Sequence, residues 1–335
     1  MSKRPTIIGI TLGDINGIGP EIALKAAFAK RPPGTRLVFI GDHDTVAREA
    51  RRRRRATPPA WNPEETPVPA HGVTVWNPAP ASTLTPRPGT CTVGASRAAY
   101  RWIVAATEAA LRGRLAALVT APINKDGFQK AGVDAPGHTE LLAALSGTTR
   151  FEMMLLADDF RVVLATRHIP IKDVAGSLTR SGVRQTIEMT ADALRWLGVR
   201  RKRIAVCGLN PHAGDGGAIG KEEQTIIRPA MRAVRRKGIV LSGPVPADSV
   251  FRQVREGAYD AVVAMYHDQA LAPFKMVAFE KGVNLTLGLP FVRTSPDHGT
   301  AYGLAGKGKA DPSSMIEAIA LAAKLATRPN PWRGP

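Results

Sequence analysis

Apolar runs long enough for a β-strand alternate with helix-length amphipathic segments along most of the chain. Most of the runs are continuous rather than alternating, which is typical of strands covered on both faces. Repeated strand–helix alternation therefore predicts an α/β fold with a largely parallel sheet. The predicted strands are 6–13, 36–41, 115–121, 161–166, 203–209 and 261–266, and the predicted helices are 19–30, 96–113, 181–197, 221–236 and 313–327.

The helical pattern at 96–113 carries signals for both of its ends. Ser96 is the predicted N-cap, and Gly113 suits the left-handed conformation of a C-terminal cap. Between them one face is apolar, as in a helix packed on a core. That face consists of Ala99, Trp102, Ile103, Ala106 and Ala110.

A chain of 335 residues is long for one compact core, so it predicts two domains or one large one. The least regular segment, 56–95, is rich in proline and surrounds one short predicted strand, 73–76. We interpret it as an excursion within the first domain, because the same α/β pattern resumes after it. A linker between independent domains is the alternative.

The net charge of the chain indicates which kinds of binding partner are favoured. Lys and Arg number 46 against 28 Asp and Glu, which gives +18 at pH 7. Such a field favours anionic partners, among them phosphorylated or carboxylated substrates, nucleic acid and anionic lipid. The densest basic run, 48–57, is interpreted as the solvated end of a surface helix, because it lacks interleaved aromatic residues and a surrounding nucleic-acid module. A nucleic-acid or membrane patch is the alternative.

Cysteine usage and the N-terminus favour the cytoplasm. Cys91 and Cys207 stand alone, without CxxC spacing, so neither a disulfide scaffold nor a cysteine-rich zinc site is expected. The apolar run after the basic N-terminus is too short for a signal peptide, and no window reaches the length of a membrane span. The sequence therefore predicts a soluble cytoplasmic protein.

Three histidines each follow a predicted strand. His168 comes after 161–166, His212 after 203–209, and His267 directly after the run that ends at Tyr266. Ligands bind at the carboxyl ends of strands in open α/β sheets, so the three imidazoles can converge. Three imidazoles would hold zinc or a similar divalent ion and leave a position open for substrate. Asp268 could orient its neighbour, and hydrogen-bonded loop histidines are the alternative.

Other polar groups occupy similar places. Thr120, Asn124 and Lys125 follow the apolar strand run 115–119, and His138 and Thr139 begin a predicted helix, where free N–H groups favour an anion. The glycine turn at 13–23 is neither GxGxxG nor a P-loop, so the usual nucleotide fingerprints are absent. Arg is suited to bidentate capture of phosphate or carboxylate. The cationic and amide residues in the last part of the chain are Lys275, Asn284 and Arg293.

Six sequence blocks resemble, in order, the 4-hydroxythreonine-4-phosphate dehydrogenase family of pyridoxal phosphate biosynthesis. They read GDINGIGPEIALKA, TAPINKDGFQKAGVDAPGHTELLA, LNPHAGDGGAIGKEE, GPVPADSVF, YHDQALAPFK and VNLTLGLPFVRTSPDHGTAYGLAGKGKADPSSM. The resemblance implies two α/β/α domains with a central cleft, akin to isocitrate and isopropylmalate dehydrogenases and distinct from the Rossmann fold. The expected domains are 1–125 with about 300–335, and 126–299, which carries most metal and substrate residues.

The resemblance also implies cofactors and partners. The segment 294–312 is similar to an NAD-adenosine loop, which makes Asp297 and Gly299 candidate cofactor residues. One divalent ion (zinc, magnesium or cobalt) would be held by His168, His212 and His267. The family is a homodimer that shares this site between subunits, so one of the three histidines would come from the partner. NAD or NADP would accept the hydride.

The implied reaction is oxidation of 4-phosphooxy-L-threonine at its secondary hydroxyl, followed by decarboxylation to 3-amino-2-oxopropyl phosphate. The metal would act as a Lewis acid and stabilise the enolate left by carbon dioxide. Asp248 and His138 are the candidates for the catalytic base. The family's substrate-binding residues correspond to His138, Thr139, Lys275, Asn284 and Arg293.

Departures from the family pattern keep other functions open. Ile15 and Asn16, Ala270, and Ala218 with Ile219 replace residues that are usual in the family. A paralogous dehydrogenase acting on phosphorylated threonate or erythronate, or on an aromatic dihydrodiol, is therefore the alternative. A metal hydrolase built on the three histidines and a basic nucleic-acid-binding protein are rivals from other classes.

Overall fold

The computed structural model describes residues 5–29, 31–63, 72–78 and 84–334, and it divides the chain into two compact units. The first unit comprises 1–149 and 289–335, and the second comprises 150–288. The basic N-terminal residues and parts of the proline-rich segment 56–95 lie outside the described residues. Compared with the boundaries expected from sequence, the stretches 126–149 and 289–299 fall in the first unit, and with them His138, Thr139 and Arg293.

The first unit contains parallel strands in the order β3-β2-β1-β4-β11. Their residues are almost continuously buried, as expected for strands covered on both faces. The strands are β1 (Thr6–Thr11), β2 (Thr35–Ile40), β3 (Val73–Trp76), β4 (Ala117–Thr120) and β11 (Val292–Pro296).

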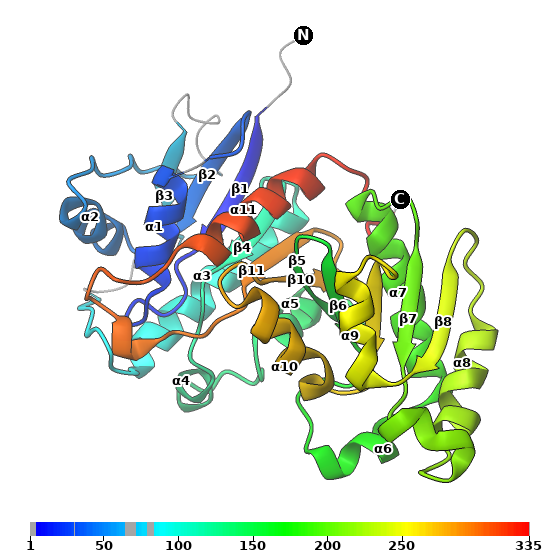
Figure 1. Cartoon of the computed structure of the whole chain (residues 1–335). Helices are drawn as coiled ribbons and strands as arrows, with labels where there is room; N and C mark the ends of the chain where they lie inside the picture. Colours follow the sequence, from blue (N-terminus) through cyan, green and yellow to red (C-terminus); the bar gives the residue numbers. More distant parts are fainter. Residues whose placement is uncertain (1–4, 30, 64–71, 79–83, 335) are drawn as a thin grey trace. The chain divides into compact units, whose positions relative to one another are not determined.

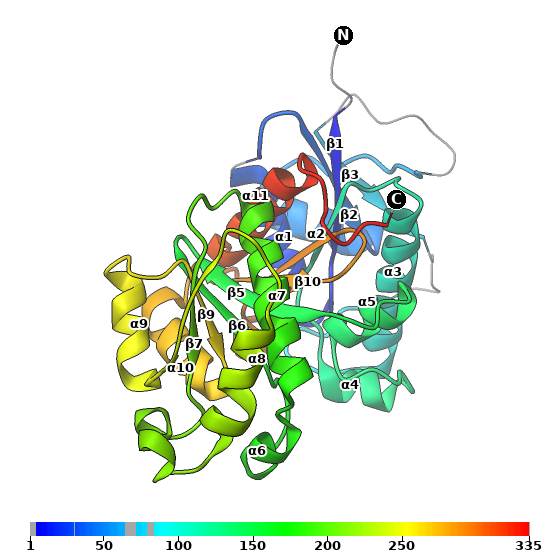
Figure 2. The same cartoon turned by 90° about the vertical axis from the view of Figure 1, so that its right-hand side faces the viewer.

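Helices cover both faces of these strands (Figures 1 and 2). On one face α11 packs on β11, β4 and β1, with α1 and then α2 beside it. On the other face α3 packs on β1 and β4 and contacts α4 and α5. The helices are α1 (Gly19–Ala29), α2 (His43–Arg52), α3 (Val93–Leu111), α4 (Lys125–Lys130), α5 (His138–Leu145), the 3-10 turn η4 (Tyr302–Leu304) and α11 (Ser313–Ala326).

The second unit has the strand order β10-β5-β6-β9-β7-β8. β5 runs antiparallel to both of its neighbours, whereas β6, β9, β7 and β8 are parallel. A two-residue turn joins β5 to β6, and Asp158 in it has a positive φ of 50°. The strands are β5 (Glu152–Ala157), β6 (Phe160–Leu164), β7 (Arg203–Cys207), β8 (Val240–Val245), β9 (Ala261–Ala264) and β10 (Val283–Leu287).

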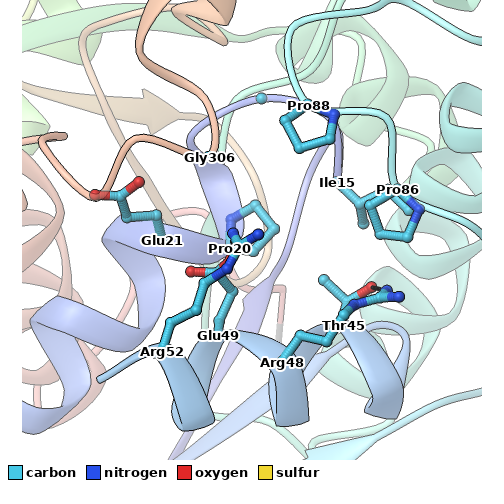
Figure 3. Close-up of a pocket in the computed structure, with 11 residues that line it drawn as sticks. Ile15, Pro20, Glu21, Thr45, Arg48, Glu49, Arg52, Pro86, Pro88 and Gly306 are labelled. Carbon is cyan, nitrogen blue, oxygen red and sulfur yellow. Dashed lines mark hydrogen bonds and ion pairs between the residues drawn. The ribbon is translucent and has the colours of Figure 1, made fainter. Parts of the chain in front are cut away.

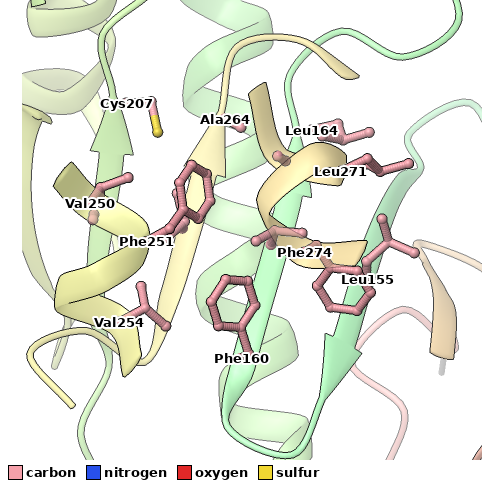
Figure 4. Close-up of a cluster of buried hydrophobic side chains, with 14 of the residues drawn as sticks. Leu155, Phe160, Leu164, Cys207, Val250, Phe251, Val254, Ala264, Leu271 and Phe274 are labelled. Carbon is pink, nitrogen blue, oxygen red and sulfur yellow. The ribbon is translucent and has the colours of Figure 1, made fainter. Parts of the chain in front are cut away.

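Alternate residues of β9 enter different cores, which shows that both faces of this sheet are covered. Val262 and Ala264 join the cluster under α9 and α10, where Phe160 stacks on Phe251 with ring centres 6.1 Å apart (Figure 4). Ala261 and Val263 join the cluster formed with α7 and α8. The helical segments are η1 (Ile171–Asp173), α6 (Val174–Ser177), α7 (Arg180–Leu197), η2 (Pro211–Gly217), the π-turn η3 (Glu223–Ile227), α8 (Arg228–Ala233), α9 (Ala247–Arg255) and α10 (His267–Ala278).

The predicted α/β fold is confirmed, and three local predictions are corrected. The N-cap of α3 is Thr92, whose side chain accepts from the Ala95 amide, while Ser96 lies a turn inside with its hydroxyl buried. The predicted helix 221–236 is a π-turn followed by a short α8 that ends at Ala233. The sheet is less parallel than expected, because β5, which the pattern analysis missed, pairs antiparallel on both sides.

Among the described residues, no helix is long and apolar enough to span a membrane. The basic run 48–57 begins in the last turns of α2, as its interpretation as a helix end predicted. Both cysteines are free, as expected; Cys91 is half-buried and Cys207 is buried.

Candidate functional site

The first unit builds a buried cationic group at the ends of two adjacent parallel strands. Arg293 lies on β11 and is only 2% exposed. Its Nε and Nη2 donate to Thr120 Oγ1, at the end of β4, over 3.2 and 2.7 Å. Since β4 and β11 are paired neighbours, the fold itself brings these two side chains together. A guanidinium held in this way has a fixed orientation, which suits binding of a carboxylate or phosphate.

The first turn of α5 carries His138 and Thr139, two of the predicted substrate residues. Thr139 is buried, and His138 is half-buried with an Nε2 that has neither solvent exposure nor a hydrogen-bond partner. Buried polar atoms are rarely left unsatisfied, so such an atom is a candidate contact for a ligand. The α5 N-terminus also favours negative charge nearby.

Electrostatics connects His138 with the cations around it. Burial, and then the charges of Arg293 and Lys125, lower the pKa of His138 well below 6.5. Burial also lowers the pKa of Arg293 to about 10, against the opposing effect of Glu140. The ring is therefore neutral at physiological pH beside a guanidinium that stays charged. This arrangement suits binding of an anion, with the imidazole as an additional hydrogen-bonding partner.

Of the predicted cluster after β4, Asn124 has a structural role. Its side chain caps α4 by accepting from the Gly127 amide over 2.6 Å. Lys125, the first residue of α4, is exposed, and its side chain approaches Gly137 at the start of α5. The structure therefore brings Lys125 into the neighbourhood of His138 and leaves Asn124 as a cap.

In the second unit, two of the three candidate metal ligands lie together. His168 follows β6 and His267 follows β9, and these strands pair in parallel. The centres of the two rings are 5.5 Å apart. His267 Nδ1 lies 2.7 Å from an oxygen of Asp268, an interaction that leaves Nε2 directed away from the carboxylate. A carboxylate on one ring nitrogen is a common way to orient a metal-binding imidazole.

Buried polar contacts fix the backbone next to this histidine pair. The Thr166 hydroxyl donates to the Met265 carbonyl over 2.7 Å, two residues before His168 on one strand end and His267 on the other. Gln269 accepts from the Met265 amide over 2.6 Å and donates to the Gly208 carbonyl over 2.7 Å. Gln269 therefore links the end of β9 to the end of β7.

His212 lies on the loop after β7 and is exposed. The loop has unusual backbone geometry, with positive φ at His212 (52°), Ala213 (54°) and Asp215 (45°). Glu223, which is 2% exposed, accepts from the amides of Leu209 and Asn210 over 2.8 Å each. Among the described residues, no group of three or more His, Cys, Asp or Glu side chains is arranged to hold a metal ion. One chain alone thus brings together His168 and His267 but not His212.

The donor set nevertheless fits a divalent ion. Two imidazoles on one zinc ion, with Zn–N distances of about 2.0–2.1 Å, have ring centres roughly 5 Å apart, close to the His168–His267 separation. Neutral imidazoles suit zinc and cobalt better than magnesium. His168 and His267 could hold the ion, and a third imidazole would complete a site of the catalytic type.

The remaining substrate and base candidates occupy separate elements of the second unit. Lys275 is half-buried on α10. Asn284 lies on β10, and its Oδ1 is buried without a hydrogen-bond partner, as expected of a group that awaits a ligand. Asp248 is exposed in the first turn of α9.

The predicted cofactor loop is joined to the glycine turn after β1. The Ile18 amide donates to the Thr300 carbonyl over 2.9 Å, and the Tyr302 hydroxyl donates to Asp14 over 2.5 Å. Glu21 accepts from the Ala310 amide over 3.0 Å. Gly299 is exposed with open space around its Cα, and the Asp297 amide donates to Ser314.

The sequence patterns did not predict the residues that fix the loops and strand ends of the candidate sites. They are Thr166, Gln269, Glu223, Asp14 and Tyr302. A signal existed for Gln269, because a buried strand run is followed by three polar residues, and only the third returns to the interior. Glu223 had none, since its partners are backbone amides 13 and 14 residues earlier.

These features define an α/β protein with a buried cationic group on one unit and a pair of imidazoles at neighbouring strand ends on the other. Residues 34–322 match the family model described as pyridoxal phosphate biosynthetic protein PdxA. The chain belongs to this family.

Relatives with known names cover nearly the whole chain. The chain is 43% identical to 4-hydroxythreonine-4-phosphate dehydrogenase of Desulfosudis oleivorans, over 96% of each chain. It is 41% identical to D-threonate 4-phosphate dehydrogenase of Pectobacterium atrosepticum, over 97% of this chain and 100% of that protein. The crystal structure of 4-hydroxythreonine-4-phosphate dehydrogenase from Klebsiella pneumoniae matches with a TM-score of 0.82 at 40% identity, over 96% of this chain and 100% of that one. The predicted family is thus confirmed, and the homologues are named as dehydrogenases.

Proposed function

We propose that this protein is an NAD(P)-dependent, divalent-metal-dependent dehydrogenase that oxidises 4-phosphooxy-L-threonine and releases carbon dioxide to form 3-amino-2-oxopropyl phosphate. Membership of the PdxA family supports the general reaction. The observation that carries the metal-dependent form is the pairing of His168 and His267 at the ends of adjacent strands.

His168, His212 and His267 hold the metal ion in this proposal. The bound ion supplies Lewis-acid chemistry to the substrate's hydroxyl and to the carbonyl that replaces it. Asp268 orients the His267 ring, Gln269 fixes the strand end that carries it, and Glu223 fixes the His212 loop. These residues position the ligands and do not contact the substrate themselves.

Anionic groups of the substrate are bound by the cationic residues. Arg293 offers its guanidinium edge, already oriented by Thr120, and α5 offers its free amides at His138 and Thr139. His138 is the better candidate for contact with the reacting part of the substrate than the exposed Asp248, because its Nε2 is buried and unpartnered. Lys275 and Asn284 are assigned to substrate binding as well.

Nicotinamide cofactor binding is assigned to the loop 294–312, with Asp297 and Gly299 as its candidate residues. The cofactor carries the hydride, and the protein's part is to orient it. Support comes from the way this loop is tied to the glycine turn through Thr300, Tyr302 and Ala310.

The proposal includes a cytoplasmic homodimer. His212 is exposed and separate from the His168–His267 pair, so the third ligand of each ion is assigned to a partner subunit. Sharing of ligands makes catalysis depend on dimerisation, which gives a direct test by mixing inactive variants.

A second substrate is favoured by a specific comparison. A relative of 41% identity is named D-threonate 4-phosphate dehydrogenase, and the 4-hydroxythreonine-4-phosphate dehydrogenase of Desulfosudis oleivorans is similarly related, at 43%. A structure described as a terephthalate 1,2-cis-dihydrodiol dehydrogenase from Burkholderia xenovorans is more distant, at 29% identity and a TM-score of 0.67. A phosphorylated threonate or erythronate is therefore the leading alternative substrate.

The deciding experiment is a substrate panel with purified protein and a divalent metal. It includes 4-phosphooxy-L-threonine, D-threonate 4-phosphate, erythronate 4-phosphate and an aromatic dihydrodiol, each with NAD and with NADP, followed at the nicotinamide absorbance band. We expect the highest kcat/KM with 4-phosphooxy-L-threonine. A higher kcat/KM with D-threonate 4-phosphate would replace the proposed substrate, and no nicotinamide reduction with any compound would contradict the dehydrogenase proposal.

A further inference from the structure

A pocket of about 100 Å³ in the first unit has no role in the proposed reaction (Figure 3). Four segments form its wall: the glycine turn with the start of α1, the exposed side of α2, the loop around Pro88 and the loop around Gly306. It shares no lining residue with the Arg293–His138 group. The lining residues are Ile15, Gly17, Pro20, Glu21, Thr45, Arg48, Glu49, Arg52, Pro86, Pro88 and Gly306.

Backbone hydrogen bonds hold these walls in place. The Gly89 amide donates to the Asn16 carbonyl over 2.8 Å, and the Arg87 amide donates to Asn16 Oδ1 over 2.6 Å. A methyl group at Gly306 would lie 3.0 Å from Pro88, so the loop with Gly306 approaches the Pro88 segment closely. The pocket is thus a formed feature that adjoins the segment 294–312.

Arg48 and Arg52 line the pocket from successive turns of α2. Both side chains extend toward the segments that carry Ile15 and Pro20 (Figure 3). Arg48 is 37% exposed and donates to Thr45 over 3.1 Å, with the Asp42 carboxylate farther away at 3.9 Å. Arg52 is 53% exposed and pairs with Glu49 over 2.8 Å. Both guanidinium groups therefore keep donors that a ligand can reach.

The two carboxylates in the wall are already compensated by other cations. Glu21 pairs with Lys25 over 2.8 Å and with Arg53 over 3.6 Å, and it also accepts from the Ala310 amide. Glu49 is shared by Arg52 and Arg53. The wall and its immediate partners therefore carry an excess of positive charge, which suits an anion of small volume.

We propose that this pocket binds the 2′-phosphate of NADP, with Arg48 and Arg52 as the residues that recognise it. The inference rests on the proposed function, in which the adjoining segment 294–312 binds the adenosine half of the cofactor. A phosphate beside that adenosine matches the pocket's size and charge, and arginine is suited to it because its planar fork donates two hydrogen bonds. The proposal assigns a preference for NADP over NAD to this chain.

Binding of adenosine 2′,5′-bisphosphate and of 5′-AMP, measured by isothermal titration calorimetry, tests the proposal without any turnover. We expect the wild type to bind the bisphosphate more tightly than AMP. Replacing both residues (Arg48→Ala with Arg52→Ala) should weaken bisphosphate binding at least about tenfold, and weaken AMP binding much less. Arg51→Ala is the matched control, because Arg51 is an exposed arginine of the same helix that does not line the pocket.

Thermal unfolding of each variant shows whether it is folded, and Arg48→Gln with Arg52→Gln replaces the alanine variant if that one is not. Equal affinity of the wild type for the two nucleotides, no binding of either, or equal losses for both in the double variant would overturn the proposal. The ratio of kcat/KM for NADP to that for NAD should fall in parallel in the double variant. Turnover with NAD but no selective loss with NADP would overturn the 2′-phosphate site while leaving the dehydrogenase function intact.

Discussion

The two units differ in how complete their candidate sites are within one chain. In the first unit, Arg293 is 2% exposed, its fork is already engaged by Thr120, and His138 is held neutral beside it. In the second unit, His168 and His212 are exposed, and only two of the three imidazoles lie together. In the proposed function, the first group binds an anion with its own residues, whereas the second needs a metal ion and another imidazole to become a site.

Desolvation explains this difference. A buried guanidinium must keep partners in every state, because an uncompensated charge in the interior is very unfavourable. Folding of the chain therefore brings Arg293, Thr120 and His138 together. Imidazoles at the surface carry no such penalty, so in the proposed site they can remain apart until a metal ion and a partner subunit bind. In the second unit, buried polar contacts instead fix the loops that carry the histidines.

The largest expected effect comes from removing a proposed metal ligand of the second unit. His267→Ala should remove bound metal and lower kcat/KM by roughly a thousandfold, because a Lewis acid supplies several kcal/mol of transition-state stabilisation. Metal content by plasma mass spectrometry and nicotinamide reduction are the measurements. His43→Ala, on α2 of the first unit, is the control and should keep both. Full activity in excess chelator would end the metal proposal.

Mixing two inactive variants asks whether the incomplete site is completed by a partner. His212→Ala and His267→Ala should each be inactive alone. If the two histidines at one ion come from different subunits, half of the molecules in a refolded mixture are mixed dimers with one intact site. Activity should then return to about a quarter of the wild-type value. No recovery, with mixed dimers demonstrated by native mass spectrometry, would place both histidines in the same subunit.

The next effect concerns the anion group of the first unit. Arg293→Lys keeps the charge but loses the fork held by Thr120, so the KM for the phosphorylated substrate should rise about tenfold or more, with a much smaller change in the KM for the nicotinamide cofactor. Arg293→Ala removes the charge too, so the pKa of His138 should rise toward its ordinary value as far as burial permits. Steady-state kinetics and histidine titration by NMR measure these changes, and an unchanged substrate KM would refute the anion role.

Sequence patterns predicted the His168–His267 pair better than the contact of Arg293 with Thr120. The places of His168 and His267 followed from strand ends, because β6 and β9 are parallel neighbours and their ends meet. The contact of Arg293 with Thr120 depends on β11 lying beside β4, a pairing across 173 residues that no local pattern contains. The β5–β6 hairpin was missed because its turn consists of two aspartates, with Asp158 in the left-handed region rather than glycine. Ser96 and Thr92 both suit an N-cap by residue type, and in the structure Thr92 is the cap because the helix begins at Val93.

A smaller effect is expected from Gln269, which links the ends of β9 and β7 next to the proposed metal ligands. Gln269→Ala leaves the Met265 amide and the Gly208 carbonyl without their buried partners, which should reduce the free energy of unfolding by about 2–4 kcal/mol. Metal affinity should also fall, by about 10–100-fold, as for other residues that orient ligands. Gln129→Ala, at an exposed position of α4, is the control. Chemical denaturation and metal titration give both values, and a loss of stability at full metal affinity would show that Gln269 serves the fold alone.

The smallest effect concerns pH and is specific to the second unit. Burial raises the pKa of Glu152 to about 7, although Arg167 and Thr186 oppose the rise. Between about pH 4.5 and 7, the folded state keeps a proton on Glu152 that the unfolded state has already released. The contribution of this proton to stability is therefore complete below the unfolded pKa and is lost as the pH rises through about 7. Its size is at most about 3 kcal/mol.

Glu152→Gln removes the titrating proton, so its free energy of unfolding should decline less than that of the wild type between roughly pH 5 and 8. Glu140→Gln in the first unit is the control variant, measured over the same pH range. Urea denaturation at several pH values measures both. Because Arg167 precedes His168 and binds Glu152 over 2.7 Å, the ionised carboxylate also fixes the segment that carries this proposed metal ligand. A wild-type profile that matches that of Glu152→Gln would show that the Glu152–Arg167 pair stays charged throughout this pH range.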